Sequence, residues 1–220
     1  MRSTAPWSPF AYIARQLDST VAELAGDAHL RSGAPVLDLG CADLHYRALL
    51  PDGVEYVGAD LVGNPWATLE LRPDGTVPAD DGSFALVLST QVLEHVEDPT
   101  GYLAECWRLL EPGGTLLLTT HGIMYYHPDP RDYWRWTGAG LAKVVEEAGF
   151  VIQELRGLMG LAPAALQLFQ DATLRRVPRR LRRPYIMAMQ AFMAFTDRRY
   201  SHEARSADAL VFAVRARKPG

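Results

Sequence analysis

The sequence has few cysteines, few lysines and no long apolar run. Its 220 residues include only Cys41 and Cys106 as cysteines, too few to hold a fold of this size together, so we expect a reducing compartment, the cytoplasm. No apolar run approaches the roughly 20 residues that a membrane-spanning helix needs, which excludes a membrane-spanning protein. The first residues lack a continuous apolar core followed by a small-residue cleavage site, so we predict no secretory signal.

The composition instead indicates one globular domain in which positive charge is unevenly distributed along the chain. Hydrophobic residues make up 48% of the chain and charged residues 22%, values typical of a domain with a well-buried core. The formal net charge is −4, and the basic residues are 20 arginines against two lysines. Six of those arginines lie between Arg175 and Arg183, so a mildly acidic protein carries one strongly basic segment.

Short β-rich runs alternate with helical stretches from about residue 35 onward, which predicts an α/β fold on a largely parallel sheet. We expect seven strands, over residues 35–39, 54–59, 67–71, 84–89, 115–120, 150–155 and 209–214. We expect helices over residues 8–26, 46–50, 99–110 and 140–148 and a long loop over 123–137. The chain therefore divides into an N-terminal helical segment, residues 1–34, and one domain, residues 35–220.

A helical insertion is expected before the last strand, over about residues 158–206. It contains two helical patterns. The second, Tyr185 to Phe195, is apolar nearly all round, so it must be buried, paired with a second copy, or laid on a membrane surface.

The residues best suited to hold a ligand follow the first two strands. In an open α/β sheet, ligands bind beyond the carboxyl ends of the strands, near the point where the strand order reverses. Gly40 follows the first strand, where the absence of a Cβ lets a ligand approach the backbone closely. Asp60 follows the second strand and is placed to accept hydrogen bonds from a ribose diol.

Three segments, taken in order, resemble the motifs of class I S-adenosylmethionine-dependent methyltransferases: VLDLGCADLHYRALLPDGVEYVGADL, DDGSFALVLSTQVLEHVEDP and LLEPGGTLLLTT. GNPW and HPDPRDYWRWT are similar to a group of small bacterial, type-11-like members. The resemblance covers about residues 35–155 and the final strand, and leaves out the insertion. It implies S-adenosylmethionine as cofactor and a Rossmann-like three-layer sandwich, whose mostly parallel seven-stranded sheet has an antiparallel last strand.

The resemblance also assigns residues to the cofactor. They are Asp38, Gly40, Cys41 and Ala42 for the methionine part, Asp60 for the ribose hydroxyls, Leu61 and Asp74 (or its neighbour Gly75) for the adenine, and Ser89, Thr90 and Gln91 beneath the sulfonium. The chain departs from the family at Ala42 and Leu44, where glycines are usual, and at Ala85, where an aspartate is usual. Ala42 suits this loop only if the backbone there needs no positive φ.

The stretch that follows the fifth strand supplies candidates for catalysis. A hydroxyl acceptor must lose its proton, and a histidine near its neutral pKa is the natural general base. We assign this role to His127, with His121 as the other candidate, Asp132 to orient the imidazole, and Arg135 to bind the acceptor. The same residues could instead only tie the loop down. The tyrosines and tryptophans between residues 125 and 136 could stack on a sugar or pack on the sheet.

Metal and partner predictions are mostly negative. Some related methyltransferases bind a divalent ion through an ExxEH arrangement, but Gln91 precedes Glu94 and His95 here, so we predict no metal. The acidic total argues against nucleic acid. Arg175–Arg183 could still bind RNA, touch anionic lipid or a phosphorylated carrier together with the helix up to residue 195, or form a solvated turn; the insertion helices could pair two copies.

The sequence therefore predicts methyl transfer to a hydroxyl of a small acceptor, such as a sugar or secondary metabolite. An RNA methyltransferase and a catalytically inactive, methyltransferase-like interaction protein are the alternatives.

Overall fold

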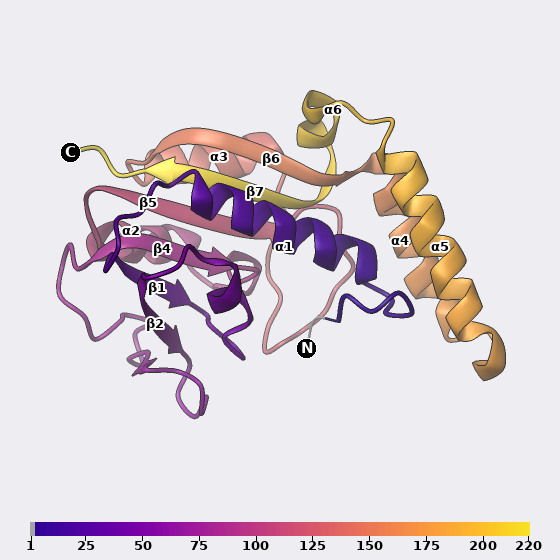
Figure 1. Cartoon of the computed structure of the whole chain (residues 1–220), viewed down its shortest axis with the longest axis horizontal. Helices are drawn as coiled ribbons and strands as arrows, with labels where there is room; N and C mark the ends of the chain where they lie inside the picture. The colour runs from indigo at the N-terminus through magenta and orange to yellow at the C-terminus, as the bar shows by residue number, and fades with distance from the viewer. Residues whose placement is uncertain (1–2) are drawn as a thin grey trace.

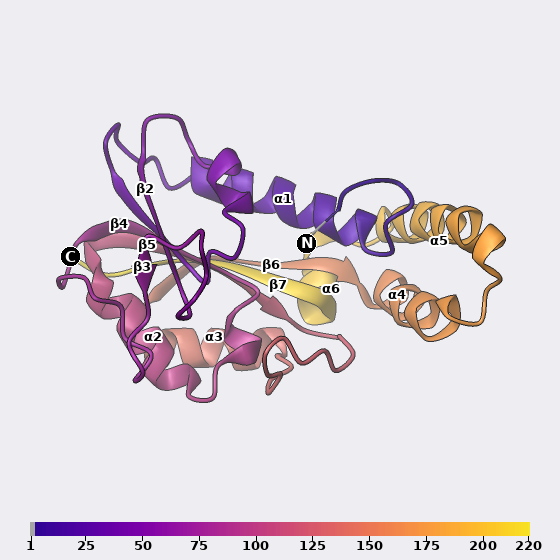
Figure 2. The same cartoon turned by 90° about the horizontal axis from the view of Figure 1, so that it is seen from below.

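The computed structural model describes residues 3–220 and places them in a seven-stranded sheet with helices on both faces (Figures 1 and 2). The strand order is β3-β2-β1-β4-β5-β7-β6. Strands β1 to β5 pair in parallel, and β7 is antiparallel to both of its neighbours, β5 and β6. The predicted Rossmann-like sandwich with an antiparallel last strand is therefore confirmed.

The elements follow the expected order along the chain. The strands are β1 (Pro35–Leu39), β2 (Glu55–Asp60), β3 (Leu69–Glu70), β4 (Phe84–Thr90), β5 (Leu110–His121), β6 (Val151–Gly160) and β7 (Ala209–Arg217). The α-helices are α1 (Ala11–Gly26), α2 (Pro99–Leu109), α3 (Gly138–Glu147), α4 (Leu161–Leu174), α5 (Arg182–Asp197) and α6 (His202–Ala207). Short 3-10 turns are η1 (His45–Leu49), η2 (Leu93–His95) and η3 (Arg179–Leu181).

Two boundaries differ from the prediction for reasons visible in the sheet. The expected crossover helix between β1 and β2 is only the 3-10 turn η1, because a tight backbone turn from Gly40 to Leu44 uses up a third of the connection. Strand β6 continues to Gly160, where it still pairs with Ala209 of β7. The helical insertion therefore begins at residue 161 rather than at 158.

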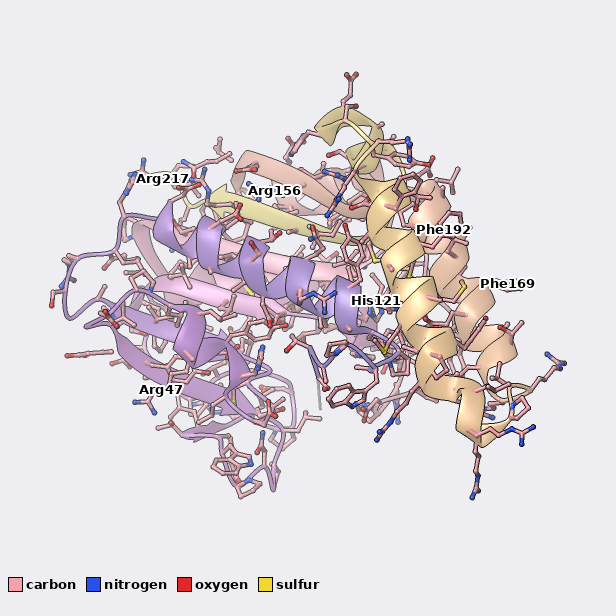
Figure 3. The ribbon with its side chains drawn as sticks, turned by 45° about the vertical axis from the view of Figure 1, so that its right-hand side comes forward. Arg47, His121, Arg156, Phe169, Phe192 and Arg217 are labelled. Carbon is pink, nitrogen blue, oxygen red and sulfur yellow. The ribbon has the colours of Figure 1, made fainter. Side chains whose placement is uncertain are left out.

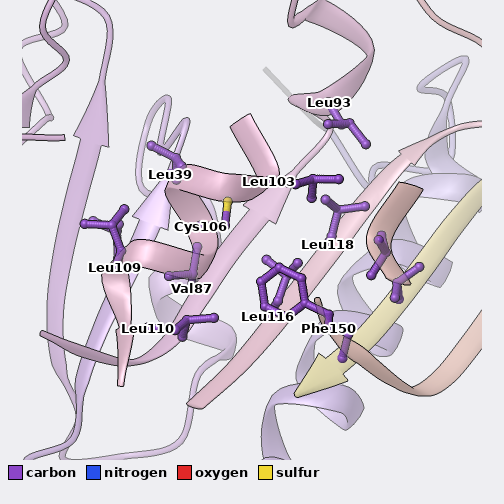
Figure 4. Packing of buried hydrophobic residues seen from close by; sticks show 14 of the residues in the cluster. Leu39, Val87, Leu93, Leu103, Cys106, Leu109, Leu110, Leu116, Leu118 and Phe150 are labelled. Atoms are coloured by element: carbon purple, nitrogen blue, oxygen red, sulfur yellow. The ribbon is translucent and has the colours of Figure 1, made fainter. Parts of the chain in front are cut away.

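The core has two layers, one on each face of the sheet. On one face, α1 packs Leu17, Val21 and Leu24 against the strands. On the other, α2 packs Leu103, Cys106 and Leu109 onto β4 and β5 (Figure 4). Strand β4 is buried along its whole length, as expected of a central strand covered on both faces. This rigid sheet fixes the positions of the loops at its carboxyl edge.

Helices α4 and α5 form an antiparallel hairpin that projects beyond the sheet, with residues 175–181 at its tip (Figures 1 and 2). The second insertion helix, expected to be buried, paired with a second copy or laid on a membrane surface, is only partly buried within this chain. In α5 only Ile186, Gln190, Met193 and Asp197 are buried, because α5 packs on α4 and α1 through one face. No helix within residues 3–220 is long and apolar enough to cross a membrane.

A polar contact ties the segment before α1 to this hairpin. The carbonyl oxygen of Pro9 accepts hydrogen bonds from the side-chain amides of Gln167, Gln170 and Gln190, at 3.0, 2.8 and 2.8 Å. The hydroxyl of Tyr12 donates to Asp197 at 2.9 Å, and burial holds the pKa of that tyrosine well above its usual value. The hairpin therefore anchors the start of α1.

Candidate functional site

A cavity of about 1050 Å³ lies at the carboxyl ends of the central strands. The residues that end or follow four of these strands line it: Gly40 after β1, Asp60 of β2, Thr90 of β4 and His121 of β5. Residues of α1 cover one side, and residues of the loop between β5 and α3 cover another. A volume at the upper end of the range for small-molecule sites leaves room for a cofactor together with an acceptor.

The loop after β1 approaches the cavity with its backbone. Gly40 has φ of +86°, and its N–H and that of Cys41 both donate to the carbonyl oxygen of Ala59, at 2.8 and 3.1 Å. A Cβ on Gly40 would lie 2.4 Å from Cγ2 of Val92, which also lines the cavity. Only glycine fits here, so the loop forms a cradle that a side chain would fill.

Ala42 and Leu44, which stand where glycines are usual in the resembled family, adopt positive φ angles of 45° and 61°. The condition set for Ala42 from the sequence, a negative φ, is therefore not met. The main-chain N–H of Ala42 donates to Asp60 at 2.9 Å, and that of Leu44 donates to the carbonyl of Cys41 at 2.8 Å. These bonds hold a strained turn in place, as is common near functional sites.

Asp60 holds the ends of β1 and β2 together. Its Oδ2 accepts from the main-chain N–H of Ala42 and, at 2.6 Å, from the side-chain amide of Asn64. Its Oδ1 accepts from its neighbour Leu61 at 2.8 Å. A carboxylate can accept about four hydrogen bonds, so Asp60 retains capacity for a ligand hydroxyl in the cavity.

The structure brings together most of the residues assigned to a cofactor. The cavity lining includes Gly40, Cys41, Ala42, Asp60, Leu61, Thr90 and Gln91. Three of the assigned residues lie outside it. Asp38 is fully buried and accepts a hydrogen bond from the Tyr56 hydroxyl at 2.6 Å. The hydroxyls of Ser89 and Tyr102 form a hydrogen bond with each other at 2.7 Å. Asp74 accepts a hydrogen bond from the main-chain N–H of Thr76. Gly75 lines the cavity in place of Asp74.

Cys41 is the only one of the two cysteines that lines the cavity. Burial, together with the nearby carboxylates of Asp38 and Asp60, raises the pKa of its thiol to about 12. The thiol is therefore protonated at neutral pH and is a poor nucleophile. Burial likewise raises the pKa of Cys106, which lies on the buried face of α2 in the core.

Three histidine rings meet in the cavity wall. The ring of His127 lies 4.7 Å from that of His121 and 5.1 Å from that of His95, measured between centroids, and all three residues line the cavity. Burial lowers the pKa of His127, and its Nδ1 is buried with no hydrogen-bond partner among the described residues. His127 is therefore a neutral imidazole near pH 7, able to accept a proton.

A buried carboxylate supports this cluster. Glu94 is fully buried; its Oε2 accepts from the Thr120 hydroxyl at 2.8 Å, and its Oε1 lies 3.2 Å from Nδ1 of His121. Ligand atoms of Glu94, His121 and His127 lie within 4.8 Å of one another, so these residues could hold a divalent cation. The prediction of a metal-free site remains a prediction.

Asp132 and Arg135 shape the loop after β5 rather than line the cavity. Arg135 donates to both carboxylate oxygens of Asp132, each at 2.6 Å, and to the carbonyl oxygens of Met124 and Tyr125. Asp132 accepts from the main-chain N–H of His127 at 2.7 Å, not from its ring. These contacts position the backbone that carries His127, whereas the sequence analysis expected contacts with the imidazole and the acceptor.

Several lining residues were missed by the sequence analysis. Phe10, Ile13 and Leu17 come from α1 and its preceding segment, and Tyr46 and Tyr102 from η1 and α2. The apolar period of α1 indicated a buried face, but nothing local showed that part of this face borders a cavity. His95 was considered only as a metal ligand, although its position shortly after Gln91, near the end of β4, could have indicated that it lines the cavity.

Comparison with known proteins agrees with this geometry. A family model described as a methyltransferase domain matches residues 10–155. The chain is 28% identical over 147 residues to a probable S-adenosylmethionine-dependent methyltransferase of Mycolicibacterium smegmatis, covering 60% of this chain and 57% of that protein. It is 28% identical over 179 residues to a ubiquinone biosynthesis O-methyltransferase of Dinoroseobacter shibae, covering 67% of this chain and 72% of that protein. The chain thus spans little more than half the length of the first of these relatives.

Among solved structures, the crystal structure of the [4+2]-cyclase SpnF is similar, with a TM-score of 0.62 and 18% identity. The match covers 99% of this chain and 85% of the SpnF chain. At this level of identity the likeness is one of fold.

Proposed function

Because the chain belongs to the class I S-adenosylmethionine-dependent methyltransferases, we propose that it methylates a hydroxyl group of a small acceptor, such as a sugar or a secondary metabolite. The observation that carries the choice of a hydroxyl is the half-buried, neutral imidazole of His127 in the same cavity as Gly40 and Asp60. The name of the relative from Dinoroseobacter shibae, an O-methyltransferase, supports the same choice.

The residues present fit the cofactor, which supplies a methyl group activated by a positively charged sulfur. Gly40 leaves the backbone open at the cradle, and Asp60 offers its remaining acceptor capacity to a ribose hydroxyl. In this proposal Leu61 covers the adenine, and Thr90, at the end of β4, and Gln91, which follows it, lie beneath the sulfonium. α1 and the loop after β5 cover two sides of the cavity. Excluding water and aligning the acceptor would supply much of the rate in a methyl displacement.

His127 acts as the general base in this proposal. Its imidazole takes the proton of the acceptor hydroxyl as the new oxygen–methyl bond forms. Asp132 and Arg135 hold the backbone that carries His127 and are positioning residues. His121, held by Glu94, lies against the His127 ring and limits its orientation.

A pH profile on hydroxylated acceptors tests this role, with formation of S-adenosylhomocysteine as the readout. Because burial lowers the pKa of His127, we expect kcat/KM to fall on the acid side with an inflection below 6.5, the usual histidine value. His127→Ala should lose about 100-fold or more in kcat and keep its affinity for S-adenosylhomocysteine. Full turnover by this variant would refute the assignment.

A matched control separates catalysis from stability. His202→Ala removes an exposed histidine at the start of α6, outside the cavity, and should leave turnover unchanged. The alternatives predict other outcomes. An RNA methyltransferase would retain RNA in a salt-sensitive manner, and an inactive interaction protein would bind neither S-adenosylmethionine nor S-adenosylhomocysteine.

A further inference from the structure

The α4–α5 hairpin exposes an apolar stripe along both of its helices. Phe169 in α4 is 58% exposed, and Phe192 and Phe195 in α5 are 50% and 52% exposed. Figure 3 shows Phe169 and Phe192 on the side of the hairpin that faces away from the sheet. Leu161 and Met187 extend the stripe, and every other exposed residue of α4 is an alanine. Exposed apolar side chains gathered on one pair of helices are typical of an interaction site.

The hairpin carries almost no negative charge. Between Leu161 and Asp197 the acidic residues are Asp171, which accepts hydrogen bonds from Gln167 and has its pKa raised by burial, and Asp197, which is 1% exposed and accepts from Tyr12. All the positive charge lies at the tip, on Arg175, Arg176, Arg179, Arg180, Arg182 and Arg183. Within residues 3–220, none of these arginines pairs with a carboxylate.

An aromatic ring extends the basic tip toward the N-terminus. The guanidinium of Arg183 lies 5.6 Å from the centre of the Trp7 ring, which is half exposed. Trp7 precedes Pro9, whose carbonyl is held by the three glutamines of the hairpin. The tip therefore presents arginines and a tryptophan beside an apolar stripe, on one firmly anchored unit.

One kind of partner satisfies both parts of this surface. A nucleic acid would neutralise the arginines but leave the phenylalanines in water. A second copy could cover the phenylalanines, but the tip has no carboxylates to offer the arginines of its partner. An anionic lipid surface accepts apolar side chains at the depth of the acyl chains and arginines at the level of the head groups.

We propose that the α4–α5 hairpin docks this protein on an anionic lipid bilayer, with Phe169, Phe192 and Phe195 entering the interface and the arginines of residues 175–183 contacting lipid phosphates. Attachment is peripheral and reversible, because it rests on a few side chains and on charge that salt screens. The proposal does not depend on methyl transfer, since lipid binding is measured without cofactor or acceptor.

Flotation of the full chain with vesicles tests the proposal. We expect binding to vesicles of one part phosphatidylglycerol and three parts phosphatidylcholine, and none to pure phosphatidylcholine. Arg179→Gln with Arg180→Gln should weaken binding about 25-fold, at about fivefold per arginine. Arg31→Gln with Arg72→Gln removes the same charge from exposed positions outside the hairpin and should change binding less than twofold.

Apolar contacts need a separate variant. Phe192→Ser should weaken binding about tenfold, whereas Val151→Ser, at an equally exposed position in β6, should have little effect. Unchanged S-adenosylhomocysteine binding and circular dichroism show that each variant is folded.

Several results would overturn the proposal. One is absence of vesicle binding. Another is an equal loss of vesicle binding in the two double arginine variants. A dimer in light scattering that Phe192→Ser dissociates, without vesicle binding, would make the stripe a contact between copies. Retention of RNA by the tip, again without vesicle binding, would make the tip a nucleic-acid site.

Discussion

Replacing Asp132 with asparagine should loosen the loop between β5 and α3 at neutral pH but not in acid. The Arg135 guanidinium and the main-chain N–H of His127 hold the pKa of Asp132 at about 2, below its usual 3.8. The Asp132 side chain is 1% exposed, so solvent screens this pair little. The ionised carboxylate therefore stabilises the folded loop by about 2 kcal/mol.

The pH dependence gives the prediction its sign. A carboxyl whose pKa is lower in the folded state stabilises that state above its unfolded pKa and loses this effect as pH falls through the folded value. The wild-type loop should therefore be more stable than the Asp132→Asn loop above about pH 4, and the difference should vanish as pH approaches about 2.

Hydrogen exchange measured by mass spectrometry on peptides covering residues 123–137 reports this stability directly. A loss of about 2 kcal/mol lowers protection about 30-fold at pH 7. Glu97→Gln is the matched control, because it breaks the Glu97–Arg131 pair, 3.7 Å apart and largely exposed, at the same loop. It should change protection little.

Unchanged protection in Asp132→Asn, or equal loss in both variants, would refute this reasoning. A large loss of turnover with unchanged protection would instead support the role that the sequence suggested for Asp132, orientation of the imidazole.

Three further experiments test the cavity and the core beside it. Gly40→Ala should lower the free energy of unfolding in urea by about 2–4 kcal/mol, because it adds a clash with Val92 to a positive φ; Gly63→Ala, at a φ of +92° in open space, should lose only about 1–2. Equal losses would exclude the clash. Tyr56→Phe should cost about 1–3 kcal/mol by removing the hydroxyl bonded to buried Asp38, and a neutral result would contradict that bond. Cys41 and Cys106 should resist a thiol reagent at pH 8 until urea unfolds the chain; immediate reaction would contradict their raised pKa values.

The alternation of strands and helices made most of the fold predictable. The run Phe84–Thr90 shows a buried central strand, and Asp98 with Pro99 marks the start of α2, where the Asp98 side chain accepts from Thr100. The end of β6 was not predictable, because its last residues are held by pairing with β7, about 50 positions away in the chain. A tertiary contact of this kind leaves no local pattern.

The sequence predicted which residues follow the strand ends at the candidate site, but it did not predict the hydrogen-bond partners of their side chains. Gly40, Asp60, Thr90 and Gln91 line the cavity because parallel strands bring their carboxyl ends to one edge. Asp38 and Ser89 lie at similar positions, yet they bond Tyr56 and Tyr102. The positive φ of Ala42 could not be read from its residue type, since it depends on the bond to Asp60.

Calorimetric titration with S-adenosylhomocysteine tests most directly whether this cavity holds the cofactor. We expect one molecule to bind per chain, Asp60→Ala to weaken binding about tenfold or more, and Asp74→Ala, outside the cavity, to leave it nearly unchanged. Failure of the wild-type chain to bind either S-adenosylhomocysteine or S-adenosylmethionine would contradict the proposed function, and a larger loss in Asp74→Ala than in Asp60→Ala would contradict the placement of the site.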